Sequence, residues 1–152
     1  MPTNPRTIRW GILATGRIAE QFATDLALVE GSELAAVGSR RVETATEFAD
    51  RYGGARSHGS YEELAADPDV DVIYVATPHS RHLEDVMTCF EGGKAVLCEK
   101  PLNLNANDSA TMIAEARSRG LFLAEAMWTR TNPNTRKMLQ LVRDGAIGTP
   151  QQ

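Results

Sequence analysis

The chain has 152 residues, 42% of them hydrophobic and 24% charged, with a formal net charge of −4 at pH 7. This length and composition are typical of a globular domain with a substantial core. The sequence has no block of like charges and no apolar run of membrane-spanning length, so we expect neither a nucleic-acid nor a membrane partner. Residues 1–6 lack the apolar run of a signal peptide, and Cys89 and Cys98 lack metal-ligand spacing. We therefore expect a cytoplasmic protein with reduced, buried thiols.

The first third of the chain alternates between strand and helix patterns. Residues 8–13 predict a strand, and apolar residues at helical spacing over 18–29 predict the helix that follows, which Gly31 ends. Residues 34–37 predict a second strand, and residues 45–52 predict a second helix. This order is that of consecutive strand–helix units.

A short helix and the most apolar strand come next. Ser60 and Glu63 have capping-box spacing, which predicts the start of the helix. Residues 70–76 are nearly all apolar, as expected for a strand covered on both faces, and Thr77-Pro78 ends it. The remaining elements are predicted, in chain order, as a helix, a strand, a helix, a strand and a helix over residues 83–90, 95–98, 110–116, 121–124 and 138–142.

The alternation predicts the α/β class, because parallel strands need crossover helices that cover both faces of a sheet. We expect a doubly wound parallel sheet of six strands, of the Rossmann dinucleotide-binding type. We assign residues 1–130 to this domain. We assign residues 131–152 to a helix and the start of a connection to a C-terminal substrate domain that this chain does not contain.

The turn after the first predicted strand is similar to a dinucleotide-binding fingerprint. Against G-x-G-x-x-G, the glycine positions hold Ala14, Gly16 and Ala19. Gly16 stands where the backbone approaches the pyrophosphate most closely, whereas Ala14 places a methyl where the tight turn favours none. A helix starting near Arg17 would aim its free N–H groups at the phosphates; a plain strand-to-helix turn is the alternative. The predicted cofactor-binding residues here are Ala14, Thr15, Gly16, Arg17 and Ile18.

The end of the second predicted strand favours NADP over NAD. A carboxylate at this position would bind the ribose hydroxyls and disfavour a 2′-phosphate, but the sequence reads Ser39-Arg40-Arg41. A guanidinium can bind a phosphate through two parallel hydrogen bonds and can stack on adenine. We therefore predict Ser39 and Arg40 as cofactor-binding residues. Two solvated arginines at a helix start are the alternative.

The loop after residues 70–76 should also face the cofactor, because it follows the carboxyl end of a strand. Two histidines three residues apart suggest a metal pair, but no third ligand cluster accompanies them, so we predict no metal site. His82 is interpreted either as a residue near the nicotinamide or as a structural one. The predicted cofactor-binding residues of this loop are Thr77, Pro78, His79 and His82.

Glu99, Lys100 and Pro101 follow the apolar run at residues 95–98. A strand over that run would deliver Lys100 to the carboxyl edge of the sheet, where ligands bind in open α/β folds. A lysine there brings three hydrogen-bond donors, and burial can lower a lysine's pKa into a useful range. We predict Lys100 as a catalytic residue, and both Glu99 and Lys100 as cofactor contacts. A surface lysine at a strand end is the alternative.

With these motifs placed, nearly the whole chain resembles the N-terminal domain of the Gfo/Idh/MocA oxidoreductase family. The resemblance rests on the turn over residues 11–19, on Ala76-Thr77-Pro78 with His82, and on Glu99-Lys100-Pro101. Residues 125–130 narrow it to the branch that contains dimeric dihydrodiol dehydrogenase and NADP-dependent D-xylose dehydrogenase.

This resemblance implies a dehydrogenase that transfers a hydride between NADP and a secondary alcohol or sugar hydroxyl. It implies that Lys100 assists proton transfer at that hydroxyl, that Trp128 lines the nicotinamide and substrate cleft, and that Arg40 holds the 2′-phosphate. A second domain would supply another acid/base group, much of the substrate pocket and the interface of a homo-oligomer. Two alternatives stay open: a non-catalytic NADP-binding sensor or scaffold module, and a nicotinamide-dependent lyase or glycosidase of the same family.

Overall fold

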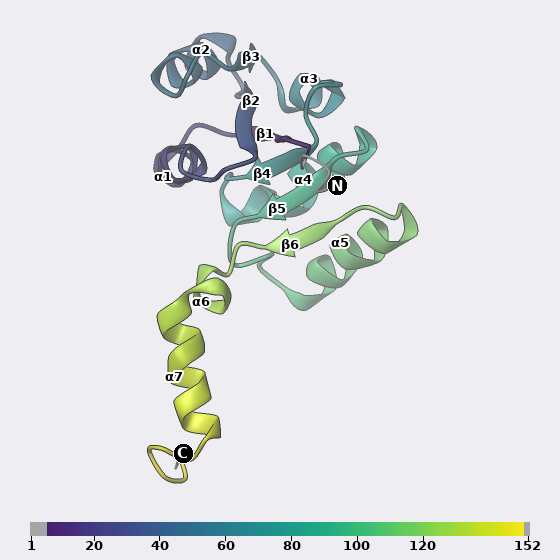
Figure 1. Ribbon diagram of the computed structural model, residues 1–152. Coiled ribbons are helices and arrows are strands. Elements are labelled where there is room, and N and C mark those ends of the chain that lie inside the picture. Colours follow the sequence, from purple (N-terminus) through teal and green to yellow (C-terminus); the bar gives the residue numbers. More distant parts are fainter. Residues whose placement is uncertain (1–5, 151–152) are drawn as a thin grey trace.

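Six parallel strands form one sheet in the computed structural model, which describes residues 6–150. The strands are β1 (Ile8–Leu13), β2 (Ser32–Gly38), β3 (Arg56–His58), β4 (Val72–Val75), β5 (Ala95–Cys98) and β6 (Leu123–Glu125). Their order across the sheet is β3-β2-β1-β4-β5-β6, and every neighbouring pair is parallel (Figure 1). The chain runs outward in opposite directions from β1 and from β4, which confirms the predicted doubly wound topology.

Helices cover both faces of this sheet. In chain order, the helices of the described residues are α1 (Arg17–Leu26), α2 (Val42–Arg51), α3 (Tyr61–Ala66), the 3₁₀ helix η1 (His79–Arg81), α4 (His82–Glu91), α5 (Ala106–Ser118), α6 (Trp128–Thr131) and α7 (Pro133–Arg143). α1 and α2 lie on one face, whereas α3, α4 and α5 lie on the other (Figure 1). The central strands are therefore shielded from water on both sides, which explains their almost continuous apolar sequences.

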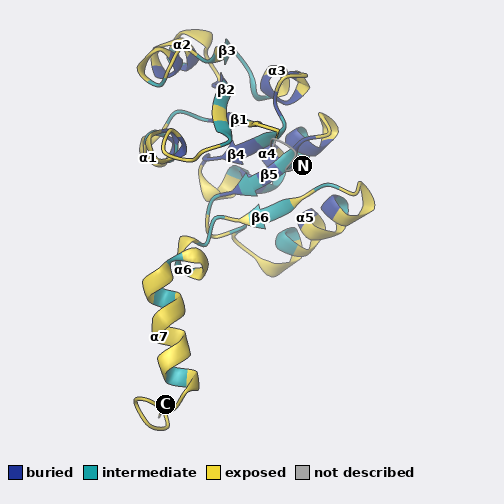
Figure 2. Ribbon diagram, viewed as in Figure 1, coloured by how far each residue is buried: buried dark blue, intermediate teal, exposed yellow. Residues whose placement is uncertain are grey.

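The buried side chains form one cluster on each face of the sheet. Beneath α1 and α2, Phe48 packs with Ile12 of β1. On the opposite face, Leu64, Phe90 and Met112 come from α3, α4 and α5 and meet over the same strands. All five side chains are at most 2% exposed, and Figure 2 shows the buried residues along the strands and the inward sides of the helices. The helices are thus held by burial of one apolar side each.

Several boundaries differ from the sequence predictions. β1 and β5 match their predicted ranges, but β3 has no predicted range, because Arg-Ser-His lacks an apolar pattern and pairs only with β2. β4 is shorter than residues 70–76, β2 is longer than residues 34–37, and β6 is shifted from residues 121–124. α1 ends at Leu26, earlier than predicted, and leaves Leu28 84% exposed.

The carboxyl end of β2 packs closely against α3. A Cβ on Gly38 would lie 2.9 Å from both Cβ and Cδ2 of Leu64, so only glycine fits at this contact without a shift. α3 begins where the capping spacing predicts, with the Glu63 N–H donating to Ser60 Oγ at 3.1 Å. The Glu63 carboxylate accepts from the Gly59 N–H rather than from Ser60. This packing brings the first turn of α3 to the carboxyl edge of the sheet.

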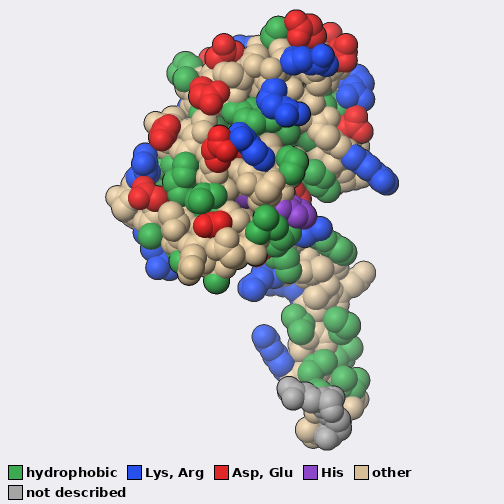
Figure 3. Space-filling model, turned by 180° about the vertical axis from the view of Figure 1, so that it is seen from behind, with side chains coloured by type: hydrophobic (Ala, Val, Ile, Leu, Met, Phe, Trp, Pro, Cys, Tyr) green, Lys and Arg blue, Asp and Glu red, His purple; other side chains and the backbone are tan. Residues whose placement is uncertain are grey.

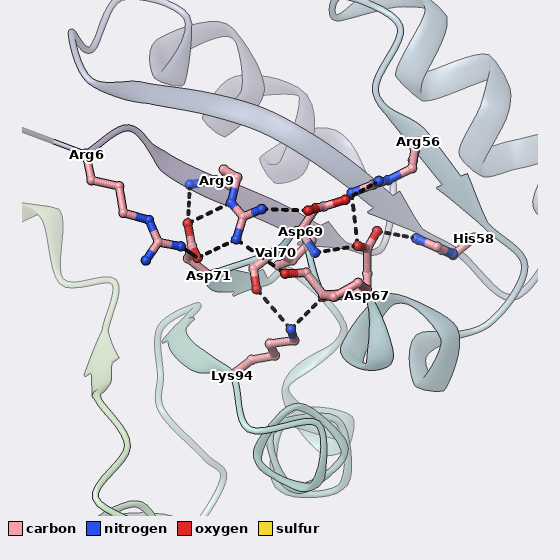
Figure 4. Close-up of polar contacts among 10 residues, drawn as sticks. Arg6, Arg9, Arg56, His58, Asp67, Asp69, Val70, Asp71 and Lys94 are labelled. Carbon is pink, nitrogen blue, oxygen red and sulfur yellow. Dashed lines mark hydrogen bonds and ion pairs between the residues drawn. The ribbon is translucent and has the colours of Figure 1, made fainter.

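A network of charged residues joins the amino ends of the strands, at the edge opposite that turn (Figure 4). Asp67 is its buried centre: the carboxylate lies 2.9 Å from Arg56 Nη2 and 2.9 Å from His58 Nε2, and it accepts the Asp69 N–H at 2.8 Å. The Lys94 ammonium donates to the Asp67 carbonyl in the same turn. The other labelled members are Arg6, Arg9, Val70 and Asp71. These contacts fasten the connection between α3 and β4.

α7 extends away from the sheet and stands clear of the rest of the molecule (Figures 1 and 3). Its apolar side chains Met138, Leu139 and Leu141 are 58%, 46% and 40% exposed. The predicted domain boundary at residue 130 falls inside α6 and stays a prediction. Within the described range 6–150, no helix is both long and apolar enough to span a membrane.

Candidate functional site

A cavity of about 620 Å³ opens at the carboxyl edge of the sheet, between the ends of β1 and β4. Its walls come from the loops after β1, β2 and β4, from the first residues of α1 and α3, and from the end of η1. The lining residues are Ala14, Thr15, Gly16, Arg17, Ile18, Ser39, Arg40, Tyr61, Ala76, Thr77, Pro78 and Arg81. This is the topological switch point, where open α/β sheets bind their ligands.

The amino end of α1 presents free backbone N–H groups to this cavity. Gly16 is the N-cap, and no side chain caps the helix. The first N–H groups of a helix have no partner within it and carry the positive end of its dipole. Gly16 has φ −79°, and a Cβ added to it would meet no protein atom within 4 Å. The packing of the protein therefore does not require glycine here, whereas a side chain would fill the space beside the free N–H groups.

Ala14 keeps the conformation that a glycine would favour. Its φ is 83°, in the left-handed region that side chains rarely adopt, which costs roughly 1–2 kcal/mol. Its N–H donates to the Gly38 carbonyl at 2.9 Å, and this bond ties the turn to the end of β2. The alanine that departs from the glycine fingerprint therefore leaves the shape of the turn unchanged.

A second cavity of about 400 Å³ adjoins the first and is lined by Thr15, Ser39, Arg40, Arg41 and Thr44. Arg40 is exposed and lines both cavities, whereas the Arg41 guanidinium donates to Thr44 Oγ1 at 3.1 Å. Among residues 6–150, no acidic residue lines either cavity. The end of β2 therefore presents arginine at the position where a carboxylate would favour NAD.

The loop after β4 divides into residues that line the cavity and residues that do not. Thr77 and Pro78 line it, and His79 is exposed outside it. His82 is fully buried, and both of its ring nitrogens contact backbone carbonyl oxygens. His82 therefore presents no surface to the cavity, and this geometry favours the structural interpretation over the predicted cofactor contact. Among residues 6–150, no group of three or more His, Cys, Asp or Glu side chains is arranged to hold a metal ion.

The residues after β5 form a tight turn, here called the lysine turn (residues 99–102). Glu99 Oε1 accepts the Tyr74 hydroxyl at 2.6 Å, and Glu99 Oε2 accepts the Lys100 N–H at 3.0 Å. Burial, and then the Glu99 carboxylate, raise the pKa of the Tyr74 phenol far above its usual range. The Glu99 carboxylate thus ties β4 to the lysine turn. Neither Glu99 nor Lys100 is among the residues that line the cavity.

Lys100 lies at the same edge of the sheet as the cavity, because β5 is the neighbour of β4. Lys100 is exposed, so the described residues do not bury it. Trp128, the first residue of α6, is 64% exposed and does not line the cavity either. The predicted site residues therefore separate into those around the cavity and those on the exposed surface beside it.

The sequence did not predict Tyr61, Ala76 and Arg81 as site residues, although all three line the cavity. Arg81 lies between the predicted loop residues His79 and His82, and its i,i+4 spacing with Asp85, with which it pairs at 2.8 Å, could have indicated its position. Tyr61 reaches the cavity only because α3 packs against the end of β2. No local sequence pattern carries that information.

Comparison with known proteins agrees with this geometry. Residues 8–127 match the model of the Gfo/Idh/MocA family, described as an oxidoreductase family with an NAD-binding Rossmann fold. The chain belongs to this family. The match covers every strand and the whole wall of the cavity.

Relatives and solved structures fall within the predicted branch and fold. Trans-1,2-dihydrobenzene-1,2-diol dehydrogenase from Bos taurus is 46% identical over 93% of this chain and 43% of its own length. D-xylose 1-dehydrogenase (NADP(+)) from Hypocrea jecorina is 43% identical over 96% of this chain and 40% of its own length. The crystal structure of KijD10, a 3-ketoreductase from Actinomadura kijaniata in complex with TDP-benzene and NADP, superposes with a TM-score of 0.88 at 32% identity. This superposition covers 94% of this chain and 45% of the KijD10 chain. The chain thus spans less than half the length of the relatives it matches.

Proposed function

We propose that this chain is the cofactor-binding part of an NADP-dependent dehydrogenase that acts on a secondary alcohol or a sugar hydroxyl. The observation that carries the proposal is the cavity at the switch point, which combines free helix N–H groups at one wall with Arg40 at another. Anionic phosphates suit both features. The catalytic lysine would stand beside this cavity, at the end of the next strand.

The residues present fit NADP. The uncapped amino end of α1 would bind the pyrophosphate, and the missing side chain of Gly16 would let the phosphates approach the N–H groups closely. Arg40, which lines both cavities, would bind the 2′-phosphate, with Ser39 beside it. Thr77 and Pro78 would form the opposite wall, towards Lys100. The bound cofactor would supply the nicotinamide that accepts a hydride.

Lys100 would act at the oxygen of the substrate. Oxidation of a secondary alcohol to a ketone removes a hydride from the carbinol carbon and a proton from its hydroxyl oxygen. An ammonium at Lys100 would donate a hydrogen bond to that oxygen, and this bond would strengthen as negative charge develops there. The proton itself would pass to the second acid/base group, which a further domain would supply. Such a positioned group typically contributes about 10² to 10⁴-fold to the rate.

The wider assignments rest on the named relatives and on the exposed surface beside the cavity. Relatives that act on a dihydrodiol or on D-xylose support a small alcohol or sugar as substrate. The exposed Trp128 would line the nicotinamide and substrate cleft once a further domain covers it. We also infer a homo-oligomer assembled through that domain, and a cytoplasmic location.

Titration of the chain with NADPH and with NADH, followed by calorimetry, tests the cofactor proposal. We expect NADPH to bind more tightly than NADH. Arg40→Ala should weaken the binding of NADPH by about 10 to 100-fold and leave the affinity for NADH nearly unchanged, because it removes a charge-assisted contact to the 2′-phosphate. Arg117→Ala is the matched control, because Arg117 is exposed on α5 and outside both cavities. Equal weakening of both nucleotides by Arg40→Ala would show that Arg40 does not read the 2′-phosphate.

Lys100→Ala separates binding from chemistry. It should leave NADPH affinity unchanged, because Lys100 does not line the cavity, and it should remove turnover in the active enzyme. Retained turnover would exclude Lys100 from the mechanism.

A further inference from the structure

His82 joins two loops that approach the active site from different strands. Its Nδ1 lies 3.0 Å from the Pro101 carbonyl oxygen and 3.1 Å from that of Leu102, both in the lysine turn. Its Nε2 lies 3.1 Å from the carbonyl oxygen of Thr77, in the loop that lines the cavity. The ring is fully buried, so water cannot replace any of these contacts.

The partners of the ring determine which protons it needs. A carbonyl oxygen only accepts hydrogen bonds, so each ring nitrogen must carry a proton to bond its partner. A neutral imidazole has one N–H and one lone pair, and it would hold that lone pair against a carbonyl oxygen in a site without water. The doubly protonated ring satisfies every contact.

We propose that His82 is a doubly protonated bridge that positions the lysine turn relative to the cofactor-facing loop at Thr77-Pro78. It is a positioning residue, because it touches neither the cavity nor Lys100's side chain but holds the backbone on either side of the reaction centre. The link between cofactor binding and the position of Lys100 rests on the proposed function, whereas the contacts of the His82 ring with the two loops do not.

A buried acid, Asp85, lies on the same helix as His82. Asp85 lies one turn further along α4, is 1% exposed, and has one carboxylate oxygen, Oδ2, buried without a hydrogen bond among the described residues. The other oxygen pairs with Arg81, which is partly in solvent.

The other titratable groups near the bridge come from η1, β5 and β6. The His79 ring centroid lies 5.5 Å from that of His82. Cys98 Sγ lies 4.0 Å from the Leu102 carbonyl oxygen, and the Leu102 N–H donates to Glu125 Oε1 at 2.8 Å. The lysine turn is therefore held from one side by His82 and from the other by Glu125.

The protonation state can be measured directly on the unaltered chain. The protein has three histidines, so ¹⁵N labelling of histidine gives a spectrum in which each ring is resolved by substitution of the other two. We expect both ring nitrogens of His82 to carry a proton in the folded chain, because both contact carbonyl oxygens. A single protonated nitrogen would overturn the bridge.

Two variants test the positioning role, each keeping one donor. His82→Asn places an amide near the position of Nδ1 and keeps the bond to the lysine turn; His82→Gln places one near Nε2 and keeps the bond to Thr77. We expect NADPH to slow hydrogen exchange of the Leu102 amide in the wild type, and we expect this response to be lost in both variants because each breaks the bridge. His58→Gln, on the outer strand β3 and far from the lysine turn across the sheet, should keep it.

If NADPH slows hydrogen exchange of the Leu102 amide in both variants as much as in the wild type, His82 does not couple the lysine turn to the cofactor-facing loop. If the wild-type chain does not bind NADPH, the proposed function fails, and the ring protonation measured by ¹⁵N labelling still decides the bridge. The two failures are thus distinguishable.

Discussion

Asp67→Ala should destabilise the fold more than any other change in the charged network at the amino ends of the strands. The Asp67 side chain is 3% exposed and bonds three partners, namely Arg56, His58 and the Asp69 N–H. Burial alone would raise the pKa of this carboxyl, but the hydrogen bonds from His58 and Asp69 and the charge of Arg56 outweigh it and lower the pKa. The folded state therefore favours the carboxylate.

The loss in the free energy of unfolding depends on the hydrogen-bond partners that Asp67→Ala leaves without the carboxylate. A hydrogen bond to a charged group contributes about 1.5–3 kcal/mol. Arg56 is half exposed and regains water, whereas the Asp69 N–H loses its partner in a part-buried turn. The desolvation penalty of the carboxylate, which is removed with it, offsets part of the loss. The net cost is about 2–4 kcal/mol in the free energy of unfolding.

Urea unfolding followed by circular dichroism measures this cost as a lower midpoint at constant slope. Asp69→Ala is the matched control, because Asp69 is 52% exposed and its ion pairs lie in solvent, so it should cost much less. Because the pKa of Asp67 is lowered by folding, the difference between wild type and Asp67→Ala should be full above pH ~4 and shrink as the pH falls below that. Equal losses for the two variants would refute the reasoning.

Three further outcomes are expected. The hydrogen bond from Arg9 lowers the pKa of Asp71 to about 2, below the ~3.9 of an unfolded aspartate. The contribution of Asp71 to stability should therefore be complete above pH ~4 and disappear as the pH falls towards 2. The pH dependence of the Asp71 carboxyl ¹³C shift measures this pKa. Burial raises the pKa of the Cys98 thiol to about 12 and raises that of Cys89 as well, so neither should react with a thiol reagent until urea unfolds the chain. Gly38→Ala should cost about 1–3 kcal/mol in thermal or urea unfolding, because the new methyl meets Leu64; an unchanged midpoint would mean that α3 moves freely.

The parts of the site that lie in one stretch of sequence could be predicted. The turn from Ala14 to Ile18 carries its own evidence, since a strand pattern precedes it and a helix pattern follows. Arg40 likewise follows a strand whose end is set by the sheet. Both sets of residues line the cavity, and their contact with a cofactor stays a prediction.

The parts that depend on packing between distant segments could not be predicted. The short edge strand β3 has no apolar pattern, and Tyr61 reaches the cavity through the contact of α3 with Gly38. His82 has the same position in sequence whether it faces a cofactor or the interior. Its burial arises because the lysine turn, 19 residues away, closes over it. The exposure of Lys100 likewise depends on what covers the edge of the sheet.

Mapping amide shifts of the ¹⁵N-labelled chain on addition of NADPH tests the central claim, that the cofactor binds where the strand order reverses. We predict that the largest changes fall on the amides of Thr15, Gly16, Arg17 and Arg40, which surround the cavity between β1 and β4. Changes confined to the opposite edge, around Asp67 and Arg9, or no change at saturating NADPH, would contradict the account.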